Sequence, residues 1–324
     1  MTKEKHMDIK AFADGVRENI SRVIVGKDKE IKLLLTCVLA GGHVLMEDVP
    51  GTGKTVMAKS LAASIDCTFS RIQFTPDLLP SDLTGINFFN QKSGEFEFRP
   101  GPLFANFILA DEINRATPRT QSALLECMEE KQVTVDGVTR ALPRPFLVIA
   151  TQNPIETQGT FPLPEAQLDR FLMKLAIGRL SHTDAVKVLE RFLSNNPLEE
   201  LKSVCSAEDI VQARQACEAC EVSEPVMSYI ASVCENTHAA ADVVLGVSPR
   251  GMLALMRACR ALALIEGRSF VTPDDVKELA VPVLAHRLSM RGIYGRTDAS
   301  RKAVREALEK TEVPTEEIKK AESL

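Results

Sequence analysis

Residues 43–65, HVLMEDVPGTGKTVMAKSLAASI, have the pattern of a strand, a glycine-containing loop and a helix. Gly51 and Gly53 let the loop curl, so that successive backbone N–H groups point at phosphate oxygens. The following helix adds the partial positive charge of its N-terminus. The sequence therefore predicts a phosphate-binding loop between this strand and this helix.

The loop departs at one position from the pattern GxxxxGK[ST], because Asp48 stands where a glycine is expected. A match that lacks one position is weaker alone, but the strand and the helix are where the mechanism requires them. Lys54 is expected to reach the β- and γ-phosphates of ATP, and Thr55 to place its hydroxyl on Mg²⁺. The predicted loop consists of Asp48, Val49, Pro50, Gly51, Thr52, Gly53, Lys54, Thr55 and Val56.

Two adjacent carboxylates follow a second apolar strand, in the stretch NFILADEINRA at 106–116. Two acids that open a loop are common and need have no function. This strand, however, lies about 55 residues after Lys54, where a phosphate-loop fold places its second carboxylate. We therefore expect Asp111 to hold Mg²⁺, directly or through a water, and Glu112 to polarise an attacking water.

Short apolar runs alternate with helical patterns up to about residue 178, which predicts a five-stranded parallel sheet with helices on both faces. We expect this α/β core, with an N-terminal helical segment, over 1–178, and a smaller all-α domain over 179–324. The expected strands are Val44–Glu47, Phe69–Phe74, Phe107–Asp111, Phe146–Thr151 and Phe171–Ile177.

Two β-hairpins are predicted to interrupt the core. Residues 82–100 alternate around Ser93-Gly94, and residues 132–143 place Asp136-Gly137 between β-branched residues. They could be surface additions without a role, or a pair of levers that pass a movement of the core to a bound partner.

The helical domain has two strong helix starts. Ser248 precedes a proline at the first helical position, and Thr272 is followed three residues later by Asp275. Pro282 is expected to kink the second of these helices.

Composition indicates a soluble globular protein, with 45% hydrophobic and 26% charged residues. The charged N-terminus has no apolar run behind it, and no stretch approaches the length of a membrane span, so we expect a cytoplasmic protein. The formal charge of −5 and the absence of tryptophan give weak support for excluding nucleic acid as a partner. The eight cysteines, including the CxxC of Cys217 and Cys220, are expected to be free thiols rather than a zinc site.

Asn153 follows the fourth strand in the run ATQNPIETQGTFPLPEAQLDRF at 150–171. At that strand end its amide could bond both the γ-phosphate and the attacking water. A turn asparagine before a proline is an equally good explanation of this residue alone.

Taken together, five motifs resemble the MoxR branch of the AAA+ ATPases. They are EDVPGTGKT, LADEINRA, VIATQNPIE, GTFPLPEAQLDRF and GVSPRG, and the resemblance covers residues 9–310, nearly the whole chain. Asp48 in place of glycine is compatible with this branch.

The resemblance implies further roles. Asn153 matches the sensor-1 residue, Arg170 an arginine finger that reaches the ATP of a neighbouring subunit, and Arg250 the sensor-2 arginine. Val25 and Gly26 match the adenine pocket, and the two hairpins match the helix-2 and pre-sensor-1 inserts. Interface or supporting roles are implied for Arg115, Glu126, Glu129 and Glu165.

The resemblance also implies a Mg²⁺-dependent ATPase that works as a homo-oligomeric ring, expected to be a hexamer. It implies a chaperone-like action on protein clients, typically partners that carry von Willebrand factor A domains. Two other classes stay open: a nucleic-acid-dependent motor, and a nucleotide-gated scaffold with little turnover. The hairpin tips carry only scattered basic residues, such as Lys92 and Arg140, which disfavours DNA translocation.

A basic stretch near the C-terminus is expected to be a solvated helix face, or alternatively a contact for an acidic partner or for the ring. Its residues are Arg287, Arg291, Arg296, Arg301, Lys302 and Arg305.

Overall fold

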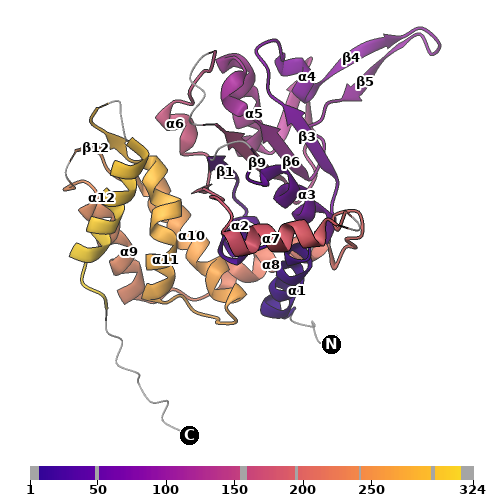
Figure 1. The fold of residues 1–324 in the computed structure, drawn as a ribbon. Helices are drawn as coiled ribbons and strands as arrows, with labels where there is room; N and C mark the ends of the chain where they lie inside the picture. Colours follow the sequence, from indigo (N-terminus) through magenta and orange to yellow (C-terminus); the bar gives the residue numbers. More distant parts are fainter. Residues whose placement is uncertain are drawn as a thin grey trace, which may run out of the picture. The chain divides into compact units, whose positions relative to one another are not determined.

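The computed structural model describes residues 7–47, 51–153, 159–193, 196–240, 242–292 and 296–314 (Figure 1). The chain divides into two compact units, Met1–Cys217 and Glu218–Leu324.

A five-stranded parallel sheet forms the centre of the first unit, with the strand order β10-β1-β9-β6-β3. All five predicted strands are present, and their ends agree with the predictions to within two residues. The strands are β1 (Val44–Glu47), β3 (Phe69–Gln73), β6 (Phe107–Asp111), β9 (Leu147–Gln152) and β10 (Met173–Leu175). β6 is buried at every position, as expected for a central strand covered on both faces. Parallel pairing brings the carboxyl ends of these strands to one edge of the sheet.

Helices connect and cover the strands (Figure 1). They are α1 (Ile9–Ser21), α2 (Asp28–Leu39), α3 (Lys54–Ser64), α4 (Pro80–Thr84), η1 (Ile113–Arg115), α5 (Pro118–Glu130), α6 (Glu165–Leu168), α7 (His182–Arg191) and α8 (Ala207–Ala219). One face of α3 is buried, with Ala58 and Leu61 inaccessible to solvent. α3 is therefore fixed against the sheet, and its N-terminus follows the phosphate loop.

Both predicted hairpins are present, and they contact each other. β4 (Gly85–Asn90) pairs with β5 (Glu95–Pro100), and β7 (Gln132–Val135) pairs with β8 (Val138–Ala141). The amide of Asn87 donates to Asp136 Oδ2 at 2.7 Å, and the guanidinium of Arg140 lies 3.9 Å above the Phe98 ring. The hairpins are thus linked by a hydrogen bond and a cation–π contact.

The first unit extends to Cys217, whereas the sequence pattern placed the change of domain at residue 178. Strand patterns do end there, but the following segment keeps contacts with the sheet layer. β11 (Cys205–Ser206) pairs with β2 (Ile65–Asp66), and Arg214 Nε donates to Val38 O at 2.9 Å. The change from strands to helices therefore precedes the boundary between the compact units.

The second unit is mainly helical. It contains α9 (Glu224–Asn236), α10 (Pro249–Ile265), α11 (Pro273–Leu284), η2 (Ala285–Arg287) and α12 (Arg296–Lys310). The predicted caps are present: Ser248 accepts from Gly251 N–H, and Thr272 forms a capping box with Asp275. A short antiparallel pair, β12 (Val243–Leu245) with β13 (Ser289–Met290), was not predicted, because segments this short give no period-2 signal.

The cysteines of the structure are free thiols, and most are buried. Burial raises the pKa of Cys234 to about 12, so this thiol is protonated at neutral pH. Within the described residues, no cluster of three His, Cys, Asp or Glu side chains could hold a metal ion. No helix in this part of the chain is long and apolar enough to span a membrane.

The basic stretch on α12 is partly paired along its own helix. Arg301 lies 4.0 Å from Asp298, and Lys302 lies 3.6 Å from Glu306. Pairs of this spacing are typical of a solvated helix face.

Candidate functional site

The loop after β1 has the backbone that the sequence predicted. Gly51 and Gly53 adopt left-handed φ values of 82° and 89°, which favour glycine. Gly53 is the N-cap residue of α3 and offers no side chain to cap it. Asp48, Val49 and Pro50, which belong to the predicted loop, lie outside the described residues.

A polar cavity of about 390 Å³ lies at the carboxyl edge of the sheet, in front of this loop. It brings together the predicted Lys54, Thr55, Asp111, Glu112 and Asn153. The complete lining is Gly51, Thr52, Gly53, Lys54, Thr55, Val56, Arg71, Asp111, Glu112, Thr151 and Asn153. Three separate motifs of the sequence thus meet at one site.

Asp111 is held by two neighbouring strands. Its Oδ1 accepts from the Thr151 hydroxyl at 2.6 Å, and its Oδ2 accepts from Arg71 Nη2 at 2.7 Å and Nε at 3.2 Å. Only 13% of the Asp111 side chain is exposed. These bonds fix the orientation of the carboxylate at the wall of the cavity.

Glu112 points away from Asp111 because its backbone is left-handed, with φ at 56°. Its N–H donates to the Thr151 hydroxyl at 2.9 Å, so Thr151 contacts both acids. Its Oε2 accepts from Gln73 Nε2 at 2.7 Å and lies 3.3 Å from Arg115 Nε. The side chain therefore rests on polar partners at the edge of the cavity.

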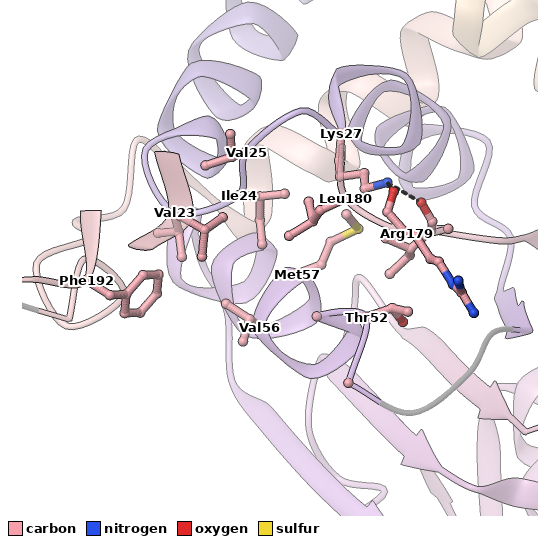
Figure 2. A pocket seen from close by; sticks show the side chains of 15 residues that line it. Val23, Ile24, Val25, Lys27, Thr52, Val56, Met57, Arg179, Leu180 and Phe192 are labelled. Atoms are coloured by element: carbon pink, nitrogen blue, oxygen red, sulfur yellow. Dashed lines mark hydrogen bonds between the residues drawn. The ribbon is translucent and has the colours of Figure 1, made fainter. Parts of the chain in front are cut away.

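A second pocket of about 410 Å³ adjoins the polar cavity, and the two share Gly51, Thr52, Gly53 and Val56. Its wall is mainly apolar, and Figure 2 labels Val23, Ile24, Met57 and Leu180 among the side chains that line it. The complete lining is Val23, Ile24, Val25, Lys27, Gly51, Thr52, Gly53, Val56, Met57, Ile177, Gly178, Arg179, Leu180, Val188 and Phe192. An apolar pocket beside a phosphate loop suits a nucleoside.

Lys27 lines this pocket and links two of its segments. Its ammonium donates to the backbone oxygens of Ile177 at 2.5 Å and Arg179 at 3.1 Å, shown as dashed lines in Figure 2. These bonds tie the loop before α2 to the segment after β10. The two segments are about 150 residues apart in the sequence and together form the wall of the pocket.

Of the two residues predicted for the base, Val25 lines the pocket, while Gly26 is not among its lining residues. Gly26 has a left-handed φ of 67°, and a Cβ there would lie 2.4 Å from Asp184 Oδ2. The glycine is thus required by the backbone and by the close approach of α7.

The two predicted arginines lie elsewhere. Arg170 is not among the described residues that line either cavity, and its Nε lies 3.1 Å from Glu129 Oε2 on α5. Arg250 is exposed in the first turn of α10, in the second unit. Their roles remain predictions.

Sequence reasoning missed Arg71, Gln73 and Thr151 on the polar side, and Lys27 and Leu180 on the apolar side. A signal existed for the first two, because polar residues at alternate positions of strand 69–73 must point to one face. The strand order decides which neighbouring strand these two side chains can reach, and the sequence did not specify that order. Leu180 and the other apolar lining residues resemble any core residue in the sequence.

The residues present fit a Mg²⁺–nucleotide complex. A left-handed glycine loop precedes a helix N-terminus, a lysine and a threonine follow it, and a carboxylate stands on the adjoining wall. Oxygen ligands from Thr55 and Asp111 are those that Mg²⁺ prefers, with remaining positions left for phosphate and water.

Comparisons with known proteins agree with this site. Residues 43–173 match the ATPase family associated with various cellular activities (AAA), and residues 235–314 match the AAA lid domain. The chain is 51% identical to the uncharacterized protein YeaC of Bacillus subtilis over 84% of this chain and 85% of that one. It is 42% identical to Chaperone MoxR1 of Mycobacterium tuberculosis, over 83% of this chain and 73% of that one.

A solved structure gives the same result for the fold. The crystal structure of a candidate ATPase from Cytophaga hutchinsonii superposes with a TM-score of 0.88 at 39% identity. The match covers 97% of this chain and 98% of that one.

Proposed function

Because this chain belongs to the MoxR family of AAA+ ATPases, we propose that it hydrolyses Mg²⁺-bound ATP at the contacts between copies of itself and uses the energy to remodel protein partners. The observation that carries the proposal is the pair of adjoining cavities that share the glycine loop. One cavity is apolar and suits a base, and the other is polar and brings Lys54 and Asp111 together.

Each residue of the polar cavity has a task in this reaction. The backbone of 51–55 and the Lys54 ammonium hold the phosphates, while Thr55 and Asp111 hold Mg²⁺. The metal supplies positive charge that offsets the charge developing on the phosphate oxygens. Glu112 accepts a hydrogen bond from Gln73 and pairs with Arg115, and its carboxylate is the group that polarises the attacking water. Asn153 orients that water against the terminal phosphate.

Arg170 supports the involvement of a second copy. Its guanidinium pairs with Glu129 and contributes to neither cavity of its own chain, so it is available as the finger for the site of a neighbour. An arginine supplied in trans accelerates comparable reactions by about 10³- to 10⁵-fold. A ring, with a hexamer as the expected size, would give every site such a neighbour.

The test is phosphate release per chain, measured over a range of protein concentrations. Turnover should rise with concentration in the wild type, and Arg170→Ala should abolish the rise while nucleotide binding is retained. Arg17→Ala, which removes a partly exposed arginine paired with Asp14 on α1, is the control. Full turnover by a dilute single chain would contradict the role of the neighbour.

The linked hairpins are proposed as the part that acts on the partner, a protein that carries a von Willebrand factor A domain. Phe89 and Phe96 near the tip of β4–β5 are 53% and 75% exposed, which suits contact with another protein. Such a partner should raise ATP turnover. Stimulation by DNA that falls steeply with salt would instead favour a nucleic-acid motor.

A further inference from the structure

Arg71 lies in β3 and lines the polar cavity, although no motif of the sequence points to it. β3 pairs with β6, and the register places Gln73 opposite Asp111 and Arg71 two residues before it. Alternation along the strand puts both side chains on the same face of the sheet. Arg71 is therefore positioned by the sheet itself to reach the carboxylate at the end of the next strand.

The contacts of Arg71 occupy one of the two carboxylate oxygens of Asp111 that could bind Mg²⁺. Oδ1 of Asp111 accepts one hydrogen bond, from the Thr151 hydroxyl. Two donors of Arg71, Nε and Nη2, lie 3.2 and 2.7 Å from Oδ2. A carboxylate oxygen has two acceptor positions, so these two bonds use both. A cation, or a water bound to it, therefore competes with Arg71 for Oδ2.

Arg71 has a second contact that keeps it in the cavity. Its Nη2 also lies 3.2 Å from Gln73 Oε1, and 47% of its side chain is exposed. A partly exposed guanidinium on a long, flexible stem can change partner without disturbing the sheet. A nucleotide bound in this cavity would bring phosphate groups to it, and a guanidinium binds phosphate well. A phosphate is therefore the alternative partner for Arg71.

We propose that Arg71 competes with Mg²⁺ for Asp111 and transfers to the terminal phosphate of ATP when Mg²⁺ binds Asp111. This inference rests on the proposed function. While it pairs with Asp111, the guanidinium offsets the charge of that carboxylate, which would otherwise repel phosphates in the cavity. After the transfer, its charge discriminates ATP from ADP, because ADP lacks the phosphate that Arg71 contacts. Arg71 is thus a positioning residue for Asp111 and a specificity-determining residue for the triphosphate.

The experiment measures binding of fluorescent ADP and ATP analogues rather than turnover. Arg71→Met keeps an apolar stem of similar length but removes every donor, so Mg²⁺ meets no competitor at Asp111. With ADP, we expect a change in the Mg²⁺ concentration that produces half of the full effect of Mg²⁺ on ADP binding. This concentration should fall about threefold, the size expected for loss of a partly exposed ion pair. With saturating Mg²⁺, the affinity for ATP should fall about tenfold and that for ADP should not change. Arg71→Lys, which keeps the charge, should recover part of the ATP affinity.

Two controls make the result specific. Arg17→Met removes an arginine of similar exposure that also pairs with an aspartate, and it should change neither quantity. In an Asp111→Asn background, the effect of Arg71→Met on the Mg²⁺ requirement should vanish, because there is no carboxylate to compete for.

An unchanged Mg²⁺ requirement and an unchanged ATP-to-ADP ratio in folded Arg71→Met would overturn the inference. So would a Mg²⁺ effect of the same size in the Asp111→Asn background. A wild-type protein that binds neither nucleotide would instead contradict the proposed function.

Discussion

At the carboxyl end of the central sheet, Asp111 and Glu112 line an open cavity, whereas at the amino end His43 and Asn106 are buried and bonded to backbone. His43 Nδ1 accepts from Val148 N–H at 2.9 Å, and its Nε2 donates to Met128 O at 3.0 Å. Asn106 accepts from Thr68 at Oδ1 and donates to Pro145 O at 3.0 Å.

Both ends therefore carry polar side chains just before or just after a strand, and only one end is a candidate site. The difference lies in charge and access. The acids at the carboxyl end keep partners that a ligand can replace, such as the guanidinium of Arg71. The amino end has neutral groups whose partners are backbone atoms and the hydroxyl of Thr68. Polar residues at strand ends indicate a site only where a cavity meets them.

The largest effect should come from the carboxyl end. Glu112→Gln keeps the size and most hydrogen bonds of the side chain but removes the base, so turnover should fall about 10²- to 10⁴-fold. Nucleotide binding should persist, as measured by titration of a fluorescent analogue. Glu130→Gln, at the exposed end of α5, is the matched control. Normal turnover by Glu112→Gln would remove this residue from the mechanism and weaken the contrast between the two ends.

At the amino end, the main effect should be on stability instead. Asn106→Leu leaves Pro145 O and the Thr68 donors without their partner, and should lower the free energy of unfolding by about 3 kcal/mol. Urea denaturation of both proteins measures the change. Asn87→Leu, which breaks an exposed bond between the hairpins, should cost about 1 kcal/mol or less.

Nucleotide affinity of the folded Asn106→Leu protein should equal that of the wild type. A large loss of affinity at full folding would mean that the amino end also shapes the site.

His43, at the amino end of the sheet, should make the stability of the fold depend on pH in the acidic range. Burial lowers the pKa of His43 from 6.5 to about 4. Between these two pH values the histidine is protonated in the unfolded chain and neutral in the folded chain. Stability should therefore fall as the pH drops from about 6.5 to about 4, by about 2 kcal/mol at pH 5. Urea denaturation at several pH values measures the slope.

His43→Gln offers both a donor and an acceptor without titrating in this range, and it should flatten the slope between pH 6.5 and 4. His182→Gln, at an exposed position in α7, should leave the slope unchanged. A wild-type slope in His43→Gln would show that another group causes the acid sensitivity.

The sequence could indicate which residues meet in the polar cavity, because these residues follow strands within recognisable motifs. Lys54, Asp111, Glu112 and Asn153 were each placed from a short local pattern, and the structure brings them to one cavity. Arg71 was missed because its importance depends on β3 lying beside β6, a pairing between segments about 40 residues apart.

The strands and hairpins of the fold were predictable because their signals are also local. The boundary between the two compact units was less predictable. Strand runs and hairpin turns carry their signal within a few residues. The extension of the first unit to Cys217 depends instead on contacts such as Arg214 with Val38, between segments 176 residues apart. The apolar pocket also depends on contacts between distant segments. In the sequence, Leu180 and Val23 look like core residues, and only the fold places them at the pocket.

The smallest predicted effect tests whether this apolar pocket belongs to the site. Leu180 is 44% exposed and lines the pocket, so a bound base would cover it. Leu180→Ala should weaken binding of both ATP and ADP about fivefold, or by about 1 kcal/mol, while turnover at saturation is retained. Leu189→Ala is the matched control, because Leu189 is 70% exposed on α7 and does not line the pocket. Equal affinities in both variants would place the base elsewhere and confine the site to the polar cavity, whereas the expected difference extends the site to residues that no motif marks.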